Sequence, residues 1–178
     1  QGLYEGVRIP EKGTVGLITY MRTDSTRISD VARAAAKEYI VKNYGEKYYE
    51  NRYYKTNKEA QDAHEAIRPT YIDVNPEDIK DVITKDQYKL YKLIYNRFMA
   101  SQMANAIYDT MAVNIKANEY DFKANGQAIK FKGFMTLYVE GTDAKEVVED
   151  GMLPELEEGN TEKLVELDPK QSFTEPPA

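Results

Sequence analysis

Residues 84–115, TKDQYKLYKLIYNRFMASQMANAIYDTMAVNI, contain the change of pattern that decides the fold class. Thr84-Lys-Asp-Gln87 fits a capping box, in which the first and last side chains bond to each other's backbone N–H groups. Helical spacing then persists to about Met103, and one face of the expected helix carries Tyr88, Tyr91, Ile94, Tyr95, Phe98 and Gln102. From Met111 apolar and polar residues alternate, so we predict a long helix followed by β-strands.

Upstream of this stretch, the sequence contains further helix signals. Ser29 is a good N-cap for a helix that ends at Gly45, and Asn75-Pro76 starts another. A short helix over residues 60–67 is expected to end at Arg68-Pro69, because the residue before proline is disfavoured in the α region. The first hundred residues are therefore predicted to be mainly helical, after a flexible lead-in at residues 13–16.

Downstream, short alternating runs predict β-strands. Asn125-Gly126 is a strong local hairpin signal, residues 131–139 are expected to continue the β region, and residues 163–167 predict one more strand. We therefore predict an α+β chain with a boundary near residue 105. Residues 1–105 would form a mainly helical domain, and residues 106–178 an incomplete antiparallel β domain.

Composition limits the chemistry available to the 178 residues. The chain has no cysteine and one histidine, so disulfides, thiolate metal sites and histidine metal sites are not expected. It has no apolar run near the roughly 18 residues that a membrane-spanning helix needs, and no signal-peptide pattern. We therefore expect no membrane partner, a cytoplasmic location, and chemistry based on Tyr, Ser, Thr, carboxylates, Arg or Lys.

The formal net charge of −6 is unevenly distributed. Residues 140–178 contain 12 acidic and 3 basic residues, a net charge of −9. Residues 1–139 contain 18 acidic and 21 basic residues, a net charge of +3. The body is thus mildly positive, which is compatible with a nucleic-acid-binding groove, and the acidic segment is expected to be a solvated surface.

Three blocks of sequence resemble type IA DNA topoisomerases. Gly16-Leu-Ile-Thr-Tyr20-Met-Arg22-Thr-Asp24-Ser25-Thr26 resembles their active-site signature, in which the tyrosine attacks a DNA phosphodiester. Ala63-His-Glu-Ala-Ile-Arg-Pro-Thr70 resembles a second signature, and residues 90–110 resemble the long helix that leads back into the β domain. Met21 favours the bacterial topoisomerase I branch over topoisomerase III, which usually has proline there, and the topoisomerase part of reverse gyrase is a further alternative.

The resemblance implies relaxation of negatively supercoiled DNA by transient single-strand cleavage through a 5′-phosphotyrosine, without ATP. The absence of a G-x-x-x-x-G-K-[ST] phosphate loop agrees with this. The resemblance also implies that the helical domain is similar to the catabolite-activator DNA-binding fold. The implied partners are single-stranded DNA and the other domains of the same enzyme, in a nucleoid-associated location.

The ends of the chain and the resemblance together predict a fragment. The sequence opens on Gln1 without methionine, and the family's metal-binding toprim domain would lie upstream, with another DNA-binding domain downstream. We therefore expect the chain alone to be inactive and to bind no metal, since Mg²⁺ would be held by the toprim domain. Exposed edges of a partial β-sheet would favour self-association.

Tyr20 and Arg22 are the candidate catalytic residues. A phenol has a pKa of about 10 and is a poor nucleophile without help. If the backbone were extended, the period of two would place both side chains on one face, where the guanidinium can hold the scissile phosphate. Asp24 is spaced to orient Arg22, although it can also be a simple salt-bridge partner.

The candidate DNA-binding residues are His64, Arg68, Thr23, Asp24 and Ser25. The resemblance implies that His64 contacts a DNA phosphate. Thr23 and Ser25 can donate hydrogen bonds to phosphate oxygens. Arg68 either binds phosphate or ties down the turn before Pro69, and the sequence leaves both roles open.

Two other classes of function remain open from the sequence. In a non-catalytic single-stranded nucleic-acid-binding module, Tyr20 would stack on a base, and Tyr20→Phe would leave the activity of the parent enzyme unchanged. In a structural or partner-binding segment, the acidic residues 140–178 would dock a basic protein in a salt-sensitive manner and the chain would not bind DNA.

Overall fold

The computed structural model describes residues 1–54, 64–139, 153, 156–171 and 173–174. Its α-helices in this part are α1 (Gly2–Glu5), α2 (Asp30–Tyr44), α3 (Pro76–Ile79) and α4 (Lys85–Ser101), with 3-10 turns η1 (Glu46–Tyr48) and η2 (Gly133–Thr136). The strands are β1 (Val7–Ile9), β2 (Gly13–Val15), β3 (Ile107–Ala117) and β4 (Tyr120–Phe131), paired as two antiparallel hairpins. This mixture of helices and antiparallel strands confirms the predicted α+β class.

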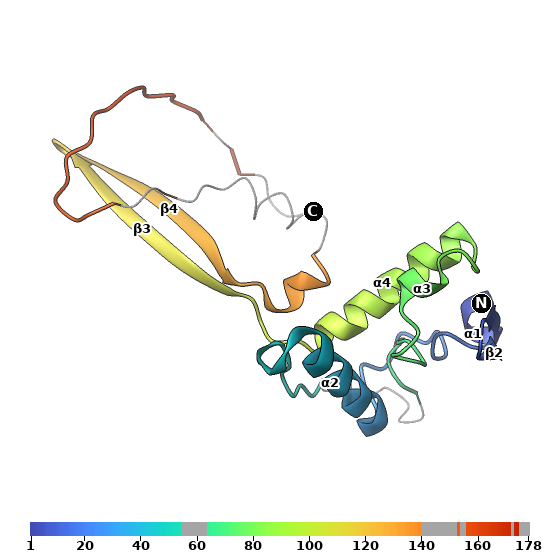
Figure 1. Ribbon diagram of the computed structural model, residues 1–178. Coiled ribbons are helices and arrows are strands. Elements are labelled where there is room, and N and C mark those ends of the chain that lie inside the picture. Colours follow the sequence, from blue (N-terminus) through green and yellow to red (C-terminus); the bar gives the residue numbers. More distant parts are fainter. Residues whose placement is uncertain (55–63, 140–152, 154–155, 172, 175–178) are drawn as a thin grey trace.

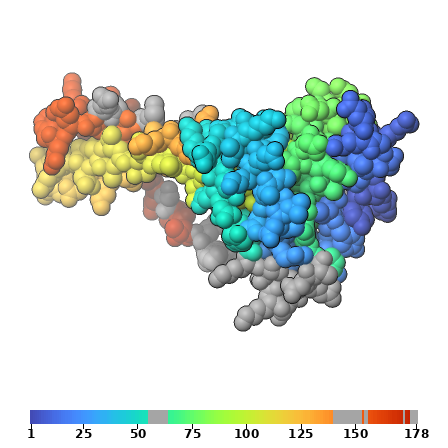
Figure 2. All heavy atoms as spheres, turned by 60° about the horizontal axis from the view of Figure 1, so that its bottom comes forward, coloured from blue at the N-terminus to red at the C-terminus, as the bar shows by residue number. Residues whose placement is uncertain are grey.

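The long ribbon of β3 and β4 projects away from the helices (Figure 1). It leaves the C-terminal end of α4, whereas α1 contacts the N-terminal end of the same helix, where Gly2 lies beside Gln87. The space-filling view shows the ribbon as an arm beside the body formed by the helices (Figure 2). Helix α4 therefore connects the N-terminal hairpin to the base of the ribbon.

The caps predicted from the sequence set the ends of the helices. Ser29 caps α2 through the N–H of Ala32, and Asn75 caps α3 with Pro76 in the first helical position. Thr84 and Gln87 form the predicted capping box of α4, which ends at Ser101, slightly before the expected Met103. These short-range signals depend on a few neighbouring residues, which is why the sequence predicted them correctly.

Two tyrosines on the buried face of α4 fasten this helix to the segment before α3. Tyr91 and Tyr95 are almost completely buried. Their hydroxyl groups donate to the carbonyl oxygens of Val74 and Ile72, each at 2.8 Å. The core therefore includes polar atoms that are satisfied by backbone groups, as buried hydroxyls require.

This arrangement predicts loss of stability at alkaline pH. Burial raises the pKa of Tyr91 and Tyr95 well above the ordinary tyrosine value. Above about pH 10 the unfolded chain loses protons that the folded chain keeps, so the free energy of unfolding should fall by up to about 1.4 kcal/mol per pH unit for each tyrosine. Urea denaturation between about pH 9 and 11 measures the slope. Tyr91→Phe should make it shallower, and an unchanged slope in that variant would contradict the assignment.

The N-terminal hairpin corrects the expectation of a flexible lead-in at residues 13–16. Gly13–Val15 forms β2, which pairs with β1 from Val7↔Val15 to Ile9↔Gly13. Gly16 then packs against α1 so closely that a Cβ atom there would lie 2.5 Å from the carbonyl oxygen of Tyr4. The N–H of Leu17 donates to the carbonyl oxygen of Leu3 at 2.7 Å, so this segment is held in place before it reaches Tyr20.

The turn of the ribbon lies elsewhere than predicted. Asn118 adopts a left-handed φ of 57° and begins the two-residue turn between Ala117 and Tyr120. The expected turn, Asn125-Gly126, lies inside β4 opposite Ala112 and Met111. Asn tolerates the left-handed region, so Asn118 can serve the turn, and the long register of cross-strand pairs then outweighs the local signal at residues 125–126.

Three other predictions were wrong in whole or in part. Strand β4 ends at Phe131, and η2 occupies part of the stretch 131–139 that was expected to be strand. Residues 163–167 are exposed coil, because no described segment pairs with them. Of the helix expected at 60–67, residues 60–63 lie outside the described part, and 64–67 are not helical. The boundary near residue 105 remains a prediction.

The base of the ribbon is fixed by three segments that meet at the end of α4. The N–H of Ala104 donates to the carbonyl oxygen of Tyr48 at 2.8 Å, and the Tyr48 ring lies 4.7 Å from that of Phe131. The N–H of Phe134 donates to the carbonyl oxygen of Ala104 at 2.9 Å. Gly133, with φ 49°, fits directly against this backbone. We call these contacts the ribbon junction.

Candidate active site around Tyr20

Backbone pairing brings the two signature blocks together. Ile18 and Pro69 form an antiparallel bridge. On either side of it, the N–H of Thr70 donates to the carbonyl oxygen of Leu17 at 2.9 Å, and the N–H of Thr19 donates to that of Arg68 at 3.0 Å. Residues that are about fifty positions apart in the sequence therefore lie side by side immediately before Tyr20.

The Thr19 side chain adds two hydrogen bonds to this pairing. Its Oγ1 donates to the carbonyl oxygen of Ala66 at 2.8 Å and accepts from the N–H of Arg68 at 3.0 Å. Through these two hydrogen bonds, the Thr19 hydroxyl holds the residue before Tyr20 against two backbone groups of the second signature block.

Thr19→Val should measure this contribution. Valine has a similar shape but no hydroxyl, so both backbone partners would lose a hydrogen bond, and the free energy of unfolding should fall by about 1–3 kcal/mol. Chemical denaturation checks the value. Thr23→Val, at an exposed threonine in the same loop, should change it by less than about 0.5 kcal/mol. Equal losses in the two variants would contradict the assigned role of Thr19.

Tyr20 lies in a cluster of aromatic rings and remains accessible. Its side chain is 51% exposed. The ring of Tyr4, from α1, lies 5.5 Å away edge-on, and the ring of His64 lies 5.9 Å away at a tilt of 32°. Aromatic neighbours on two sides restrict the phenol ring while its exposure leaves it open to a large substrate.

His64 contributes an unsatisfied polar atom to this cluster. Its ring is half-buried, and its Nδ1 is buried with no hydrogen-bond partner among the described residues. A buried ring nitrogen without a partner is uncommon and calls for an explanation such as a ligand. The structure therefore places His64 next to Tyr20 with unused hydrogen-bonding capacity, and its contact with a DNA phosphate stays a prediction.

Arg22 is arranged differently from the expectation. Its N–H donates to the carbonyl oxygen of Tyr20 at 2.9 Å, which is a tight turn rather than the extended backbone on which the same-face expectation depended. The Arg22 Nε pairs with Asp24 Oδ2 at 2.9 Å, and both side chains are partly exposed. Oδ1 of Asp24 is buried without a partner in the described structure. Asp24 is thus an ion-pair partner of Arg22, and a role in orienting Arg22 toward a phosphate stays a prediction.

The remaining candidate residues differ in their accessibility. Thr23 is exposed, whereas Ser25 is buried and its Oγ accepts from the N–H of Arg27 at 3.2 Å. The Arg68 guanidinium pairs with Glu65 at 2.6 Å, donates to the carbonyl oxygen of Pro69 at 3.0 Å and reaches Ser29 Oγ at 3.5 Å. Arg68 therefore ties the turn down in this structure, and a role in phosphate binding stays a prediction.

Two residues of this site were missed in the sequence. Tyr4 reaches Tyr20 from α1, and no motif marked it, because the contact depends on the close approach at Gly16. Thr19 lies inside the first signature block, but nothing in that block marks its hydroxyl for hydrogen bonds to residues 66 and 68. Hydrogen bonds across about fifty residues have no local sequence signal.

The described residues offer no group of three His, Cys, Asp or Glu side chains that could hold a metal ion. These residues therefore do not provide the ligands for the Mg²⁺ that the family resemblance implies. The roles proposed for this chain do not involve a metal. In the same part of the chain no helix is long and apolar enough to cross a membrane.

Comparison with known proteins agrees with the geometry. A family model described as DNA topoisomerase matches residues 1–178. The fold is also similar to the crystal structure of full-length topoisomerase I from Thermotoga maritima, with a TM-score of 0.67 and 36% sequence identity. That match covers 87% of this chain and 24% of the Thermotoga protein, so the chain spans about a quarter of the length of that relative.

Proposed function

The chain belongs to the DNA topoisomerase family, and from that premise we propose that it carries the nucleophilic tyrosine of a bacterial type IA enzyme. The parent protein would relax negatively supercoiled DNA without ATP, by cutting and rejoining one strand. The observation that supports this most is the position of Tyr20, which is half-exposed and packed against His64 from a distant block of sequence. Its topoisomerase I rather than topoisomerase III character is part of the proposal and rests on Met21.

In the proposed reaction, Tyr20 Oη gives its proton to a water molecule and bonds to the phosphorus of a phosphodiester in a single DNA strand. The P–O3′ bond breaks, and the 3′ oxygen takes a proton from a group outside this chain, which the family resemblance places in the toprim domain. The product is a 5′-phosphotyrosine. The linkage between Tyr20 and the DNA is itself a phosphodiester and replaces the one that was broken. Rejoining by the reverse steps therefore needs no nucleotide.

Three side chains would act on the phosphate. Arg22 is partly exposed and already oriented by Asp24, and its remaining guanidinium N–H groups can bind the charge that develops on the phosphate oxygens. His64 lies beside the attacking ring and can offer an N–H to the same phosphate. The exposed Thr23 can add a hydrogen bond from its hydroxyl group.

The test is to locate the covalent linkage. The full-length enzyme would be mixed with Mg²⁺ and an end-labelled single-stranded oligonucleotide, denatured, digested with protease, and the DNA-bearing peptide identified by mass spectrometry. The proposal expects the nucleotide on Tyr20. Linkage to another tyrosine, or binding of DNA with no linkage at all, would contradict it. The second outcome would favour the non-catalytic single-strand-binding module.

The isolated chain is proposed to self-associate through the ribbon. Met111, Ile115 and Phe122 are exposed, and Ile115 and Phe122 are cross-strand partners, so one face of β3 and β4 presents apolar side chains. Ile115→Lys should shift the isolated chain toward monomer in light scattering at a fixed concentration. Lys116→Ile should not have this effect, and a monomeric unsubstituted chain would contradict the proposal.

A further inference from the structure

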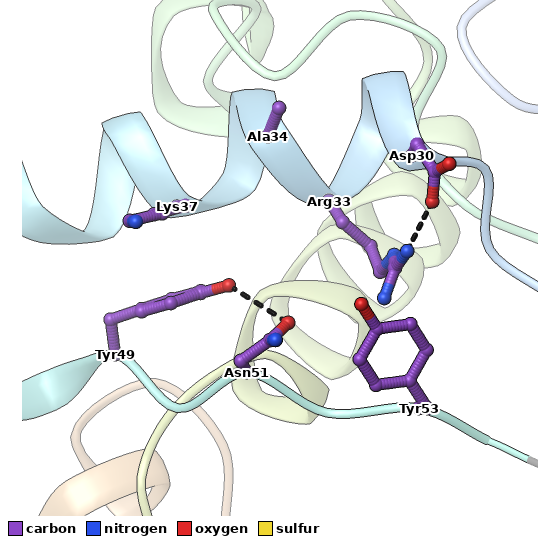
Figure 3. Close-up of a pocket in the computed structure, with 7 residues that line it drawn as sticks. All are labelled: Asp30, Arg33, Ala34, Lys37, Tyr49, Asn51 and Tyr53. Atoms are coloured by element: carbon purple, nitrogen blue, oxygen red, sulfur yellow. Dashed lines mark hydrogen bonds and ion pairs between the residues drawn. The ribbon is translucent and has the colours of Figure 1, made fainter.

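An open cleft lies between α2 and the segment that follows η1, and none of the residues that line it belongs to the aromatic cluster of Tyr20. It has a volume of about 560 Å³ and is open to solvent. Figure 3 shows that α2 forms one wall and the segment after η1 the other. The side chains that line it are Asp30, Arg33, Ala34, Lys37, Tyr49, Asn51 and Tyr53. Two cations therefore face two phenol rings across one cleft.

Arg33 provides a stacking partner inside the cleft. Its guanidinium carbon lies 3.8 Å from the centroid of the Tyr53 ring, and its Nη2 pairs with Asp30. Its side chain is only 15% exposed, and Nε and Nη1 are buried without a hydrogen-bond partner in the described residues. Because Asp30 already offsets the charge of Arg33, this side chain is better suited to planar stacking than to holding a phosphate alone.

Tyr53 completes the platform, and in the described structure its ring is largely exposed. Arg33 covers one side of the ring, yet Tyr53 remains 73% exposed. An exposed aromatic face backed by a guanidinium is suited to stacking an unpaired base, since every base has a π face. Bases in duplex DNA are already stacked on each other, so the platform favours single-stranded nucleic acid.

Lys37 provides the uncompensated charge. Its Nζ lies 5.4 Å from the centroid of the Tyr49 ring. Among the residues that the structure describes, no carboxylate lies within ion-pair distance of it. An exposed ammonium group that is not neutralised by an acid can bind a backbone phosphate and release its counterions.

The cleft and the site of Tyr20 are joined through the N-terminus of α2. Ser29, which caps this helix, lies 3.5 Å from Nη2 of Arg68 in the second signature block. Asp30 and Arg33 follow in the first turn of the helix. A strand bound near His64 can therefore continue onto this end of α2.

We propose that the cleft between α2 and residues 49–53 is a second contact for the single DNA strand, in which Tyr53 backed by Arg33 stacks a base and Lys37 binds a phosphate. This inference rests on the proposed function, since it assumes a single-stranded substrate. The cleft would contribute to the affinity of the enzyme for the DNA strand, and this contribution would not depend on the reaction at Tyr20.

Binding measurements on the full-length enzyme test the two roles separately. Fluorescence anisotropy with a labelled oligothymidylate, without Mg²⁺, would be repeated over a range of salt concentrations. Tyr53→Ala should raise the Kd about fivefold or more, whereas Tyr53→Phe should retain the affinity. Lys37→Gln should lower the slope of log K against log salt by about 0.7, the value for one phosphate of a single strand. The matched control is Lys42→Gln, an exposed lysine of α2 outside the cleft, which should leave the slope unchanged.

Photo-crosslinking separates failure of this inference from failure of the proposed function. An oligonucleotide with 5-iodouracil crosslinks to aromatic rings that stack on it, and the same samples can be assayed for the Tyr20 adduct with Mg²⁺. We expect a crosslink in the peptide that contains Tyr53. A Tyr20 adduct without that crosslink, or equal salt slopes for Lys37→Gln and Lys42→Gln, would overturn the cleft assignment and leave the proposed function intact. A crosslink at Tyr53 without a Tyr20 adduct would overturn the proposed function and retain the cleft.

Discussion

Tyr20→Phe is expected to abolish the covalent DNA adduct and supercoil relaxation by the full-length enzyme. The variant removes only the oxygen that would attack phosphorus. The ring contacts with Tyr4 and His64 do not involve that oxygen, and no described residue makes a hydrogen bond to it. Stability and strand binding should therefore change little while adduct formation falls below detection. Gel electrophoresis of labelled DNA under denaturing conditions measures the adduct.

Tyr4→Phe is the matched control for this result. Tyr4 is a second exposed tyrosine in direct ring contact with Tyr20, so it would be the nearest alternative nucleophile. The adduct should persist in Tyr4→Phe. An adduct that survives in Tyr20→Phe and disappears in Tyr4→Phe would move the reaction to Tyr4, and full activity in both variants would favour the binding-module function.

Gly133→Ala should cause the largest loss of stability among single-methyl additions to this chain. Gly133 has a φ of 49°, and a Cβ atom there would lie 2.4 Å from the carbonyl oxygens of both Ala104 and Asn105. Left-handed backbone costs a residue with a side chain about 1–2 kcal/mol, and overpacking against rigid neighbours adds about 1–3 kcal/mol. We expect the free energy of unfolding to fall by about 3 kcal/mol or more in chemical denaturation.

Gly13→Ala isolates the backbone part of that loss. Gly13 also has a left-handed φ, 73°, but no atom lies within 4 Å of the added Cβ position. Its loss should therefore be limited to about 1–2 kcal/mol. If the two variants lose equal stability, the close approach at the ribbon junction contributes nothing and the assignment is wrong.

The sequence predicted best the features that depend on neighbouring residues. The caps at Ser29, Asn75 and Thr84 each involve atoms within one helical turn, and each was confirmed. The hairpin turn was placed wrongly because the choice between Asn118 and Asn125 depends on the pairing of two whole strands. The strand expected at residues 163–167 failed for a related reason, since a strand exists only where another segment pairs with it.

The candidate site shows the same division. The signatures named Tyr20 and His64 as separate candidate residues, and the structure places their rings 5.9 Å apart. They anticipated that Asp24 pairs with Arg22, but they did not predict the turn closed by the hydrogen bond between the N–H of Arg22 and the carbonyl oxygen of Tyr20. Nor did they predict Tyr4, whose contact with Tyr20 follows from the packing of α1 against Gly16.

The ribbon junction has a mechanical consequence. The segment from α4 to β3 is bonded to residue 48 on one side and to residue 134 on the other, so the connection cannot bend without breaking these contacts. A load on the base of the ribbon is therefore carried to the end of α4 through these hydrogen bonds. If the parent enzyme opens to let a DNA strand pass, we expect its pivot to lie away from the ribbon junction.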